Sequence, residues 1–340
     1  MATNNQKYFD TVSKYVKKFS NSPKRAIARK MFEENKLLFG KFERAYVALR
    51  YYTEASGKRK RKSIQKSNNA LTVTKFGLDS KPINPFDLPE SDYSPAEPFT
   101  IPTSITKLGI LADIHIPEHD IQALTAAIRD LQNENIDGLL LNGDILDMHQ
   151  VSRHFKDPGR ARIKKEFELG LQFIQAIKNA FPGIPIYFKE GNHEKRWPVW
   201  LRSRAIEIWD DEEFTIPAKL RLGEHSITWI PNNQPIRYGN LWIIHGNEIS
   251  GNSRVSPAHA VSLKAHESTL TGDKHRPDKK HVKHQLSGSI TTYYTTGCLC
   301  GLRADYLPNN DWMHGFAIAY VNSQGNVSVQ NKEIHEGVIL

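Results

Sequence analysis

Cysteine and long apolar runs are both scarce in this chain of 340 residues. Its two cysteines, Cys298 and Cys300, are one residue apart within GCLCG. Such close neighbours rarely form a disulfide, and two thiols alone do not make a zinc site, so we interpret both as small buried side chains. No apolar run is long enough to span a bilayer, and the first residues lack the pattern of a secretory signal. We therefore expect a cytoplasmic protein in a reducing environment, with no membrane partner.

Basic residues are concentrated in the first fifth of the chain. Residues 1–66 hold 18 Lys/Arg and 5 Asp/Glu, a net charge of +13, whereas the remainder holds 28 and 32, a net charge of −4. This asymmetry predicts a segment that binds a polyanion, most often nucleic acid, beside a nearly neutral main body. The sequence gives no indication of the oligomeric state.

The basic segment contains periodic apolar residues that predict helices between Pro23 and Tyr52, with a turn at Gly40. Two helices joined by a short glycine turn are compatible with a helix-turn-helix unit; a helical hairpin that packs on the main domain is the alternative. The run at 57–66, GKRKRKSIQK, adds phosphate contacts or is a solvated linker. We divide the chain into a basic helical segment (1–66), a proline-rich linker (67–100) and a compact domain (101–340).

Five clusters of residues that bind metals follow five strand-like stretches in the compact domain. The stretches are KLGILAD, IDGLLLNGD, IPIYFKEGNHE, NLWIIHGNE and STLTGDKH. Because ligands gather at the carboxyl ends of neighbouring strands in open α/β sheets, we expect the clusters to converge in one crevice. The residues are Asp113 and His115, Asp144, Asn192 with His193 and Glu194, His245, and Asp273 with His275.

The order of elements around these clusters indicates the fold class. We expect helices over 121–133, 162–180 and 198–209 and near 257–266, with further strands towards the carboxyl terminus. Alternating βα units followed by more strands predict an α/β fold with two packed sheets flanked by helices.

The ligand set suits phosphoester hydrolysis. Two divalent cations about 3.5–4 Å apart acidify a bridging water and clamp the transition state. Asp144 is the natural bridge between them. Oxygen and imidazole ligands favour Mn²⁺, with Fe or Zn²⁺ as alternatives, over Ca²⁺ or a metal that demands thiolate. The residues expected to complete the first site are Asp113, His115 and His275, and those of the second site are Asn192, His245 and Asp273.

Residues next to these ligands are candidates for catalysis and substrate binding. His193 can face the phosphate and act as a general acid for the leaving oxygen or as a transition-state stabiliser. Glu194 either orients His193 or caps the following helix. Asp147 and Arg153 follow the Gly-Asp turn, and Arg153 is a candidate phosphate clamp, although an exposed loop arginine is the commoner explanation. We therefore assign catalysis to His193 and Asp144, and substrate contacts to Arg153, Asn192 and His193.

Together the clusters resemble the calcineurin-like metallophosphoesterase superfamily, whose pattern is D-x-H, G-D, G-N-H-[D/E], H and G-H-x-H. The match covers about residues 107–276. The resemblance implies a four-layer α/β/β/α sandwich with a dimetal site on the strand-end loops. It also implies that Asp113, His115, Asp144 and His275 ligate one metal, and Asp144, Asn192 and His245 the other. The N-terminal helices resemble those of phage and bacterial members, which implies a bacterial or phage-infected cell.

Asp273 departs from the family pattern, which has histidine at this position. Aspartate is a harder donor with a shorter reach and one more negative charge, which Lys274 would partly offset if it turned inward. Three outcomes are open: a working site with altered metal preference, a weakened second metal, or an inactive variant.

The leading function is that of a metal-dependent phosphodiesterase acting on nucleic acid, through a metal-bridging hydroxide with His193 assisting the leaving group. The alternatives are a phosphatase on phosphoprotein or small phosphoesters, and a nucleic-acid-binding protein with an impaired phosphoesterase domain. Fold alone does not choose among them.

Overall fold

The computed structural model describes residues 4–19, 23–53, 89, 97–153, 159–160, 162–249, 255–303, 307 and 309–340. The chain divides into two compact units, residues 1–92 and 93–340. The basic run 57–66 and nearly all of the expected linker 67–100 lie outside the described residues. In the part of the chain that is described, no helix is long and apolar enough to cross a membrane.

The first unit is helical and has its own apolar core. Its core residues include Val12 and Tyr15 from the first helix, Met31 from the second and Leu49 from the last. Asn35 ties two helices together, because its Nδ2 donates to the Tyr15 hydroxyl at 3.0 Å and to the Met31 carbonyl at 2.9 Å. The helices are α1 (Asn4–Lys18), α2 (Lys24–Glu34), α3 (Lys36–Phe39) and α4 (Phe42–Thr53). The expected helices between Pro23 and Tyr52 are present, whereas α1 had not been predicted.

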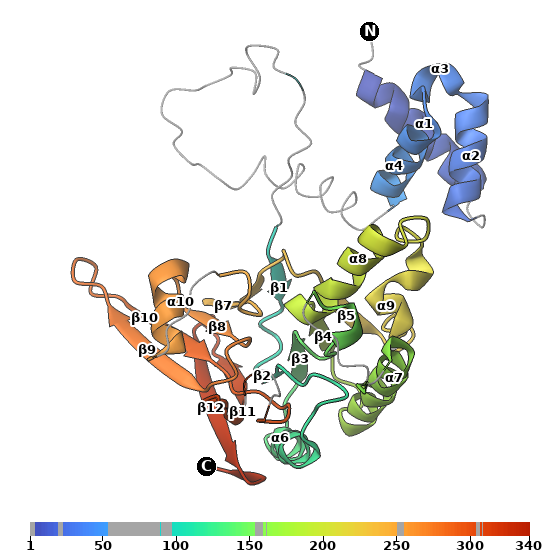
Figure 1. Cartoon of the computed structure of the whole chain (residues 1–340). Coiled ribbons are helices and arrows are strands. Elements are labelled where there is room, and N and C mark those ends of the chain that lie inside the picture. Colours follow the sequence, from blue (N-terminus) through green and yellow to red (C-terminus); the bar gives the residue numbers. More distant parts are fainter. Residues whose placement is uncertain are drawn as a thin grey trace. The chain divides into compact units, whose positions relative to one another are not determined.

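The second unit contains two mixed sheets (Figure 1). In the larger sheet, β2 to β5 run parallel to one another and β11 to β13 are antiparallel. Its order is β13 (Val338–Ile339), β12 (Val327–His335), β11 (His314–Val321), β2 (Lys107–Leu111), β3 (Gly138–Asn142), β4 (Ile186–Lys189), β5 (Ile227–Ile230). The smaller sheet has the order β1 (Phe99–Ile101), β6 (Ile236–Tyr238), β7 (Leu241–Ile243), β8 (Thr269–Thr271), β10 (Ile290–Thr295), β9 (Asp278–Lys283).

Alternating side chains of the central strands divide the core between two layers. On β3, Leu140 joins the cluster between the two sheets, while Leu139 and Leu141 join the cluster beneath the helices. This follows from the strand's period of two, and both faces are apolar because both are covered. The helices of this unit are α6 (Ile121–Asn133), α7 (Ile163–Ala180), α8 (Asn192–Arg204), α9 (Ile216–Lys219) and α10 (Pro257–Ala265), with 3-10 turns η1 (His149–Val151) and η2 (Glu212–Phe214).

The packing of helices on the two outer faces completes four layers. Residues of α6, α7 and α8 pack in the cluster on the larger sheet, and Ala258 and Val261 of α10 pack against Tyr293 of the smaller sheet. The expected α/β/β/α sandwich is confirmed. Helix α8 begins at Asn192, earlier than the expected 198, because Glu194 accepts a hydrogen bond from the Gly191 amide and caps the helix.

Candidate metal centre

The predicted ligands lie at the carboxyl ends of strands from both sheets. Asp113 follows β2, Asp144 follows β3 and Asn192 follows β4 in the larger sheet, while His245 follows β7 and Asp273 follows β8 in the smaller sheet. The crevice that they line therefore spans the carboxyl edges of both sheets, which is where the sequence had placed it.

Left-handed backbone conformations turn these side chains into the crevice. The φ angles of five predicted ligands are positive: Asp113 55°, His115 52°, Asp144 53°, Asp273 60° and His275 54°. A non-glycine residue in this region costs about 1–3 kcal/mol, and such residues cluster at functional sites. Five of them in one crevice indicate that the placement of these side chains outweighs the conformational strain of the backbone.

Two glycines allow the carboxylates to approach the neighbouring loops. A Cβ atom on Gly191 would lie 2.2 Å from Oδ1 of Asp144, and one on Gly272 would lie 2.6 Å from Oδ2 of Asp113. Any side chain at either position would push a carboxylate out of place. Gly191 and Gly272, which precede ligands in the sequence motifs, are therefore required because there is no room for a side chain at either position.

Asp144 lies at the middle of the cluster. Its Oδ2 is 3.2 Å from Nε2 of His245, 3.6 Å from Nε2 of His193 and 3.9 Å from Nε2 of His115. On the other side, Nε2 of His275 is 3.3 Å from Oδ1 of Asp113. Three trios have ligand atoms within 4.8 Å of one another: Asp113–Asp144–His245, His115–Asp144–His193 and His115–His275–Cys300.

Unpartnered buried atoms show that these residues fit a metal. Among the described residues, Nε2 of His115, Nε2 of His245 and Oδ1 of Asn192 are buried without a hydrogen-bond partner. His245 is fixed from behind, because its Nδ1 lies 2.8 Å from the Asn142 carbonyl, which can only accept, so Nε2 is the nitrogen left for a cation. A buried polar atom left unpaired costs about 1–3 kcal/mol. All three atoms belong to predicted ligands, so a cation is their natural partner.

The carboxylates make the crevice favourable for positive charge. Burial opposes the charged form of both His245 and His275. Even so, Asp144 raises the pKa of His245 well above its usual value, and Asp113 raises the pKa of His275 to about 10. The field that stabilises an imidazolium here would also stabilise a metal ion.

Buried Glu194 holds the turn that carries Asp144. Its Oε2 accepts from the amides of Asp144 and Gly191, each at 2.9 Å, and its Oε1 accepts from the Leu146 amide at 2.8 Å. Burial, and then the Asp144 charge, raise the pKa of Glu194 to about 7. Of the two roles expected for Glu194, the structure supports helix capping, and it adds the support of the Gly-Asp turn.

His193 is oriented by Asp147 and Arg196 instead. Its Nδ1 donates to the Asp147 carbonyl at 2.7 Å, and its Nε2 accepts from Nη2 of Arg196 at 2.6 Å. The Asp147 carboxylate lies 3.3 Å from Nδ1 of His193 and 3.4 Å from Nδ1 of His115. Burial alone would raise the pKa of this carboxyl, but the two histidines outweigh it and hold the pKa far below its usual value.

Asp273 is paired with its neighbour. Nζ of Lys274 lies 2.6 Å from Oδ2 of Asp273, while Oδ1 faces Nε2 of His245 at 3.9 Å. The backbone amide of Asp273 donates to the Asp113 carboxylate. The lysine has thus turned inward and offsets the added charge, and Oδ1 remains directed at the second site.

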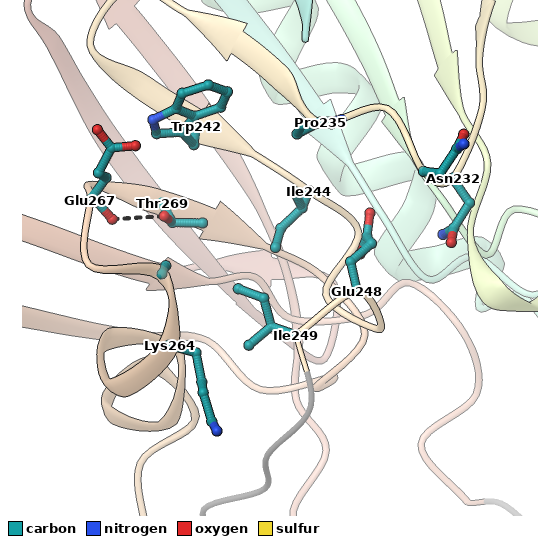
Figure 2. Close-up of a pocket in the computed structure, with 11 residues that line it drawn as sticks. Asn232, Pro235, Trp242, Ile244, Glu248, Ile249, Lys264, Glu267 and Thr269 are labelled. Atoms are coloured by element: carbon teal, nitrogen blue, oxygen red, sulfur yellow. Dashed lines mark hydrogen bonds between the residues drawn. The ribbon is translucent and has the colours of Figure 1, made fainter. Parts of the chain in front are cut away.

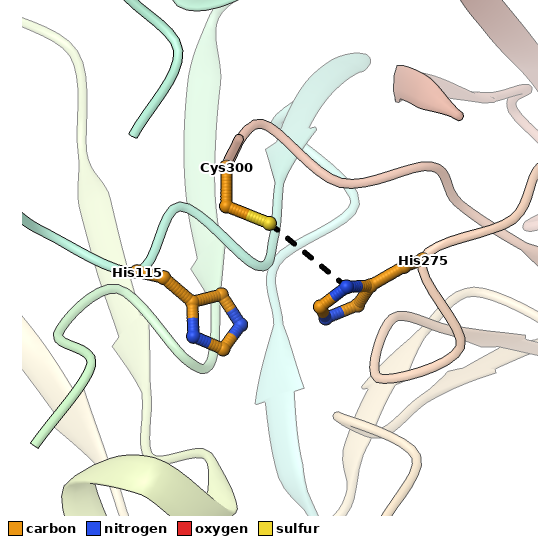
Figure 3. Close-up of side chains that lie close together, drawn as sticks. All are labelled: His115, His275 and Cys300. Carbon is orange, nitrogen blue, oxygen red and sulfur yellow. Dashed lines mark hydrogen bonds between the residues drawn. The ribbon is translucent and has the colours of Figure 1, made fainter. Parts of the chain in front are cut away.

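Several residues around the crevice had not been identified from sequence. Sγ of Cys300 lies 3.9 Å from Nδ1 of His275 (Figure 3), and the Trp312 ring packs against the His275 ring with centroids 4.2 Å apart. Arg160 contacts Asp147 at 3.2 Å. Proximity of GCLCG to a strand end was the only sequence signal for Cys300. Arg153, by contrast, is exposed and does not line the pocket over the ligands, so its role remains a prediction.

A separate, larger pocket of about 440 Å³ is lined in part by Ile244 and Glu248, which flank His245 in the sequence (Figure 2). Trp242, Ile244, Glu248 and Lys264 are among the residues that line it. Its walls bring together none of the metal-ligand trios described above. The chemistry therefore belongs to the crevice, although this pocket has more room.

Comparisons with known proteins identify the family of this chain. The Gene 54 protein of Mycobacterium phage L5 is 25% identical over 234 residues, which cover 64% of this chain and 90% of that protein. Among solved structures, Vacuolar Protein Sorting 29 from Cryptosporidium parvum is 14% identical, with a TM-score of 0.38, over 69% of this chain and 94% of its own. A dimetal phosphatase from Danio rerio is 12% identical, with a TM-score of 0.35, over 67% and 96%. The family model of the calcineurin-like phosphoesterases matches residues 106–308, more than half of the sequence, and the chain therefore belongs to that family.

Proposed function

We propose that this protein hydrolyses phosphodiester bonds in nucleic acid, using two divalent cations of which Mn²⁺ is preferred. The family supports a dimetal phosphoesterase. The observation that carries the proposal is the convergence of Asp144 with the unpartnered buried atoms of His115, Asn192 and His245. Oxygen and imidazole donors in this mixture suit Mn²⁺.

The charge of the N-terminal unit supports nucleic acid as the substrate. Within residues 10–53, eleven Lys/Arg side chains are exposed, against four exposed Asp/Glu. Lysine and arginine gain from counterion release when they meet phosphates, so such a unit favours a polyanion over a small ester. The exposed basic residues are Lys14, Lys17, Lys18, Lys24, Arg25, Arg29, Lys30, Lys36, Lys41, Arg44 and Arg50.

The side chains around the crevice would position the substrate and move a proton. When bound, two cations supply an activated water and neutralise the phosphoryl charge. Asp144 and Asn192 would hold them. His193 is fixed through Nδ1, and its Nε2 becomes a donor to the leaving oxygen once Arg196 releases it and Nε2 carries a proton. Arg196 remains anchored through Nη1 on the Asp147 carbonyl at 2.8 Å, which leaves Nη2 to turn towards a phosphate oxygen.

A nucleic-acid-binding protein with slow turnover is the second candidate. The pairing of Asp273 with Lys274 favours it, because a carboxylate already neutralised by lysine attracts a second cation less strongly. This candidate predicts binding of DNA without metal-dependent hydrolysis.

The deciding experiment is Mn²⁺-dependent hydrolysis of bis-p-nitrophenyl phosphate and of single- and double-stranded DNA. Asp144→Asn is expected to lower every rate by roughly 10³-fold or more, since Asp144 contacts both halves of the ligand set. Asp210→Asn, an exposed carboxylate, is the matched control. Hydrolysis of the ester without cleavage of DNA would favour a phosphatase, and DNA binding without any hydrolysis would favour the second candidate.

A second experiment tests the N-terminal unit. Replacing four basic residues of α2 by glutamine should weaken DNA binding and flatten its salt dependence, by a slope of about 0.9 for each phosphate that is no longer neutralised. The comparison is the ratio of DNA cleavage to ester hydrolysis in each variant. The substituted residues are Lys24, Arg25, Arg29 and Lys30, and the control set, exposed in the second unit, is Arg129, Lys164, Lys165 and Arg204. Equal effects of the two sets would contradict a specific role for this unit.

A further inference from the structure

A small pocket lies directly over the first metal-ligand residues. Its volume is about 50 Å³, and it is lined by His115, Glu118, Asp147, Arg160, His275, Cys300, Gly301, Arg303 and Trp312. A cavity needs about 10–15 Å³ to hold one water molecule, so the pocket has room for a small group such as a phosphate. The substrate roles of Arg160, Arg303 and Trp312 are not part of the ligand pattern described above.

Arg160 is built into this pocket. Its side chain is 18% exposed, and Nη1 lies 3.2 Å from Oδ2 of Asp147. The same carboxylate faces His115 and His193, so Arg160 is linked through Asp147 to the ligand shell. A guanidinium carries five N–H donors in a fixed fork, a geometry that suits contacts to more than one acceptor group.

Arg303 and Trp312 form the other wall, and their segments are tied together. Nδ2 of Asn310 donates to the Leu302 carbonyl at 2.8 Å, and its Oδ1 accepts from the Trp312 amide at 3.0 Å. The Gly301 amide donates to the Glu118 carbonyl at 2.7 Å, which fixes the start of the Arg303 segment. Arg303 is exposed, and Trp312 is half-buried with its ring against His275.

The pocket sets two guanidinium groups, Arg160 and Arg303, against the carboxylates of Asp147 and Glu118, and it favours an anion once the carboxylate-lined crevice beneath it holds its cations. His115, His275 and Cys300 have ligand atoms close enough for a metal (Figure 3). Two guanidinium groups line the same space, however, and each would repel an additional cation held there. Glu118 is exposed and its backbone, through its carbonyl, faces the Gly301 amide. Bidentate guanidinium donors match the geometry of a phosphate.

We propose that this pocket binds the phosphate next to the scissile one in a nucleic-acid strand, with Arg160 and Arg303 donating to its oxygens. Trp312 packs against the nucleoside that joins the two phosphates, since indole rings stack on bases and sugars without sequence preference. The proposal rests on the proposed function and narrows it. The preferred substrate is a phosphodiester with a neighbouring phosphate, and an isolated ester is a poor one.

The test is the binding of two thymidine phosphonates, in which a methylene group replaces the ester oxygen so that neither is hydrolysed. One carries a phosphonate at the 5′ position only, and the other carries one at both the 3′ and 5′ positions. In the Mn²⁺-loaded full chain, calorimetry should give at least about tenfold tighter binding of the second compound, the gain expected from charge-assisted contacts to one more phosphate. The readout is this ratio of dissociation constants.

Arg303→Gln and Arg160→Gln should each bring the ratio towards one, and Arg129→Gln, an exposed arginine on α6, should leave it unchanged. Arg303 is exposed, so its variant is expected to fold, and a melting curve checks this. A ratio near one in the parent chain, or a ratio that survives both variants, would overturn the proposal. If the ratio behaves as expected but the chain cleaves no DNA, the second phosphate site stands and the nuclease function fails.

Discussion

The two halves of the metal centre are built on different supports. The first half, defined as Asp113, His115 and His275, is backed by side chains, since Nδ1 of His115 faces the Asp147 carboxylate and Nδ1 of His275 faces the Cys300 thiol. The second half, defined as Asn192, His245 and Asp273, is supported by main-chain groups and by the ion pair between Lys189 and Glu248. There, Nδ1 of His245 contacts the Asn142 carbonyl.

In the second half, the charge of one ligand can be considered separately from the type of its donor atom. Where the family pattern leads one to expect histidine, Asp273 brings an oxygen donor and a negative charge, and Lys274 offsets that charge at 2.6 Å. The second half therefore changes from a nitrogen to an oxygen donor with little change in net charge. A harder donor at the same charge is expected to shift metal preference while leaving the site able to bind a cation.

Lys189→Met should break the support of the second half and produce the largest effect. The Lys189 side chain is fully buried, and Nζ lies 3.0 Å from Glu248, which in turn accepts from the amides of His245 and Gly246. Removing one partner of a buried ion pair costs about 3–5 kcal/mol in unfolding free energy, measured by urea denaturation. Lys164→Met, on an exposed face of α7, is the control. If Lys189→Met/Glu248→Gln were no more stable than Lys189→Met, the ion pair would not be the cause.

Changes in pH should loosen the support of the first half through Glu166. This buried carboxyl accepts from the Met148 amide next to Asp147, and burial raises its pKa to about 8 from 4.5. A raised pKa in the folded state means that its stabilising contribution is present below pH 4.5 and is lost as the pH rises through about 8. The parent chain should therefore lose roughly 4 to 5 kcal/mol relative to Glu166→Gln over this range, since one pKa unit is about 1.4 kcal/mol. Parallel stability curves for the two chains would refute this.

Substitutions at Asp273 and Lys274 should sharpen the contrast between donor type and charge. Asp273→His is expected to move the preference of the second half from Mn²⁺ towards Zn²⁺ by about tenfold, because imidazole is the softer donor. Lys274→Met should instead tighten both metals by a similar factor, because it exposes the carboxylate charge. Competitive titration of the two metals measures both effects. An equal change in Zn²⁺ preference from the two substitutions would show that charge, and not donor type, controls the site.

Cys300→Ala should have the smallest effect and should be confined to the first half. Loss of the thiol removes a weak partner of His275 Nδ1, so metal affinity is expected to fall only a few-fold, within the lower range for outer-shell substitutions. Cys300→Ser, which keeps a polar atom at this point, should recover most of the loss. Cys298→Ala, the neighbouring buried thiol, is the control for packing.

The sequence was informative about the strands and their ligands because both signals are local. An apolar run predicts a buried strand, and the short motif after it fixes which residues can reach the crevice, as Asp113 and His115 do after β2. The same local signal placed α6 and most of α7. Helix α8 was predicted late because Pro198 was taken for its first turn, whereas the Glu194 cap sets the start.

Residues that reach the crevice through tertiary packing could not be predicted in this way. Trp312 and Cys300 both lie between β10 and β11, whereas His275 follows β8. They are brought to His275 by the pairing of β10 with β8, which no short motif encodes. Arg153 and Arg160 lie in the same loop region and look alike in sequence. Only the course of the chain places Arg160 against Asp147 and leaves Arg153 exposed.

The left-handed conformation of five ligand residues has a consequence for mutational scanning. Aspartate, asparagine and histidine are the non-glycine residues that tolerate this conformation best, whereas β-branched residues are strongly disfavoured. In a saturation library scored only for folded protein, Asp113, Asp144 and Asp273 should therefore accept asparagine or glycine and reject valine and isoleucine, even though none of these replacements keeps the carboxylate. The substitutions tolerated at these positions would then reflect the left-handed backbone conformation. Loss of activity alone would not show that a residue is a metal ligand, because a substitution can also act by straining the backbone.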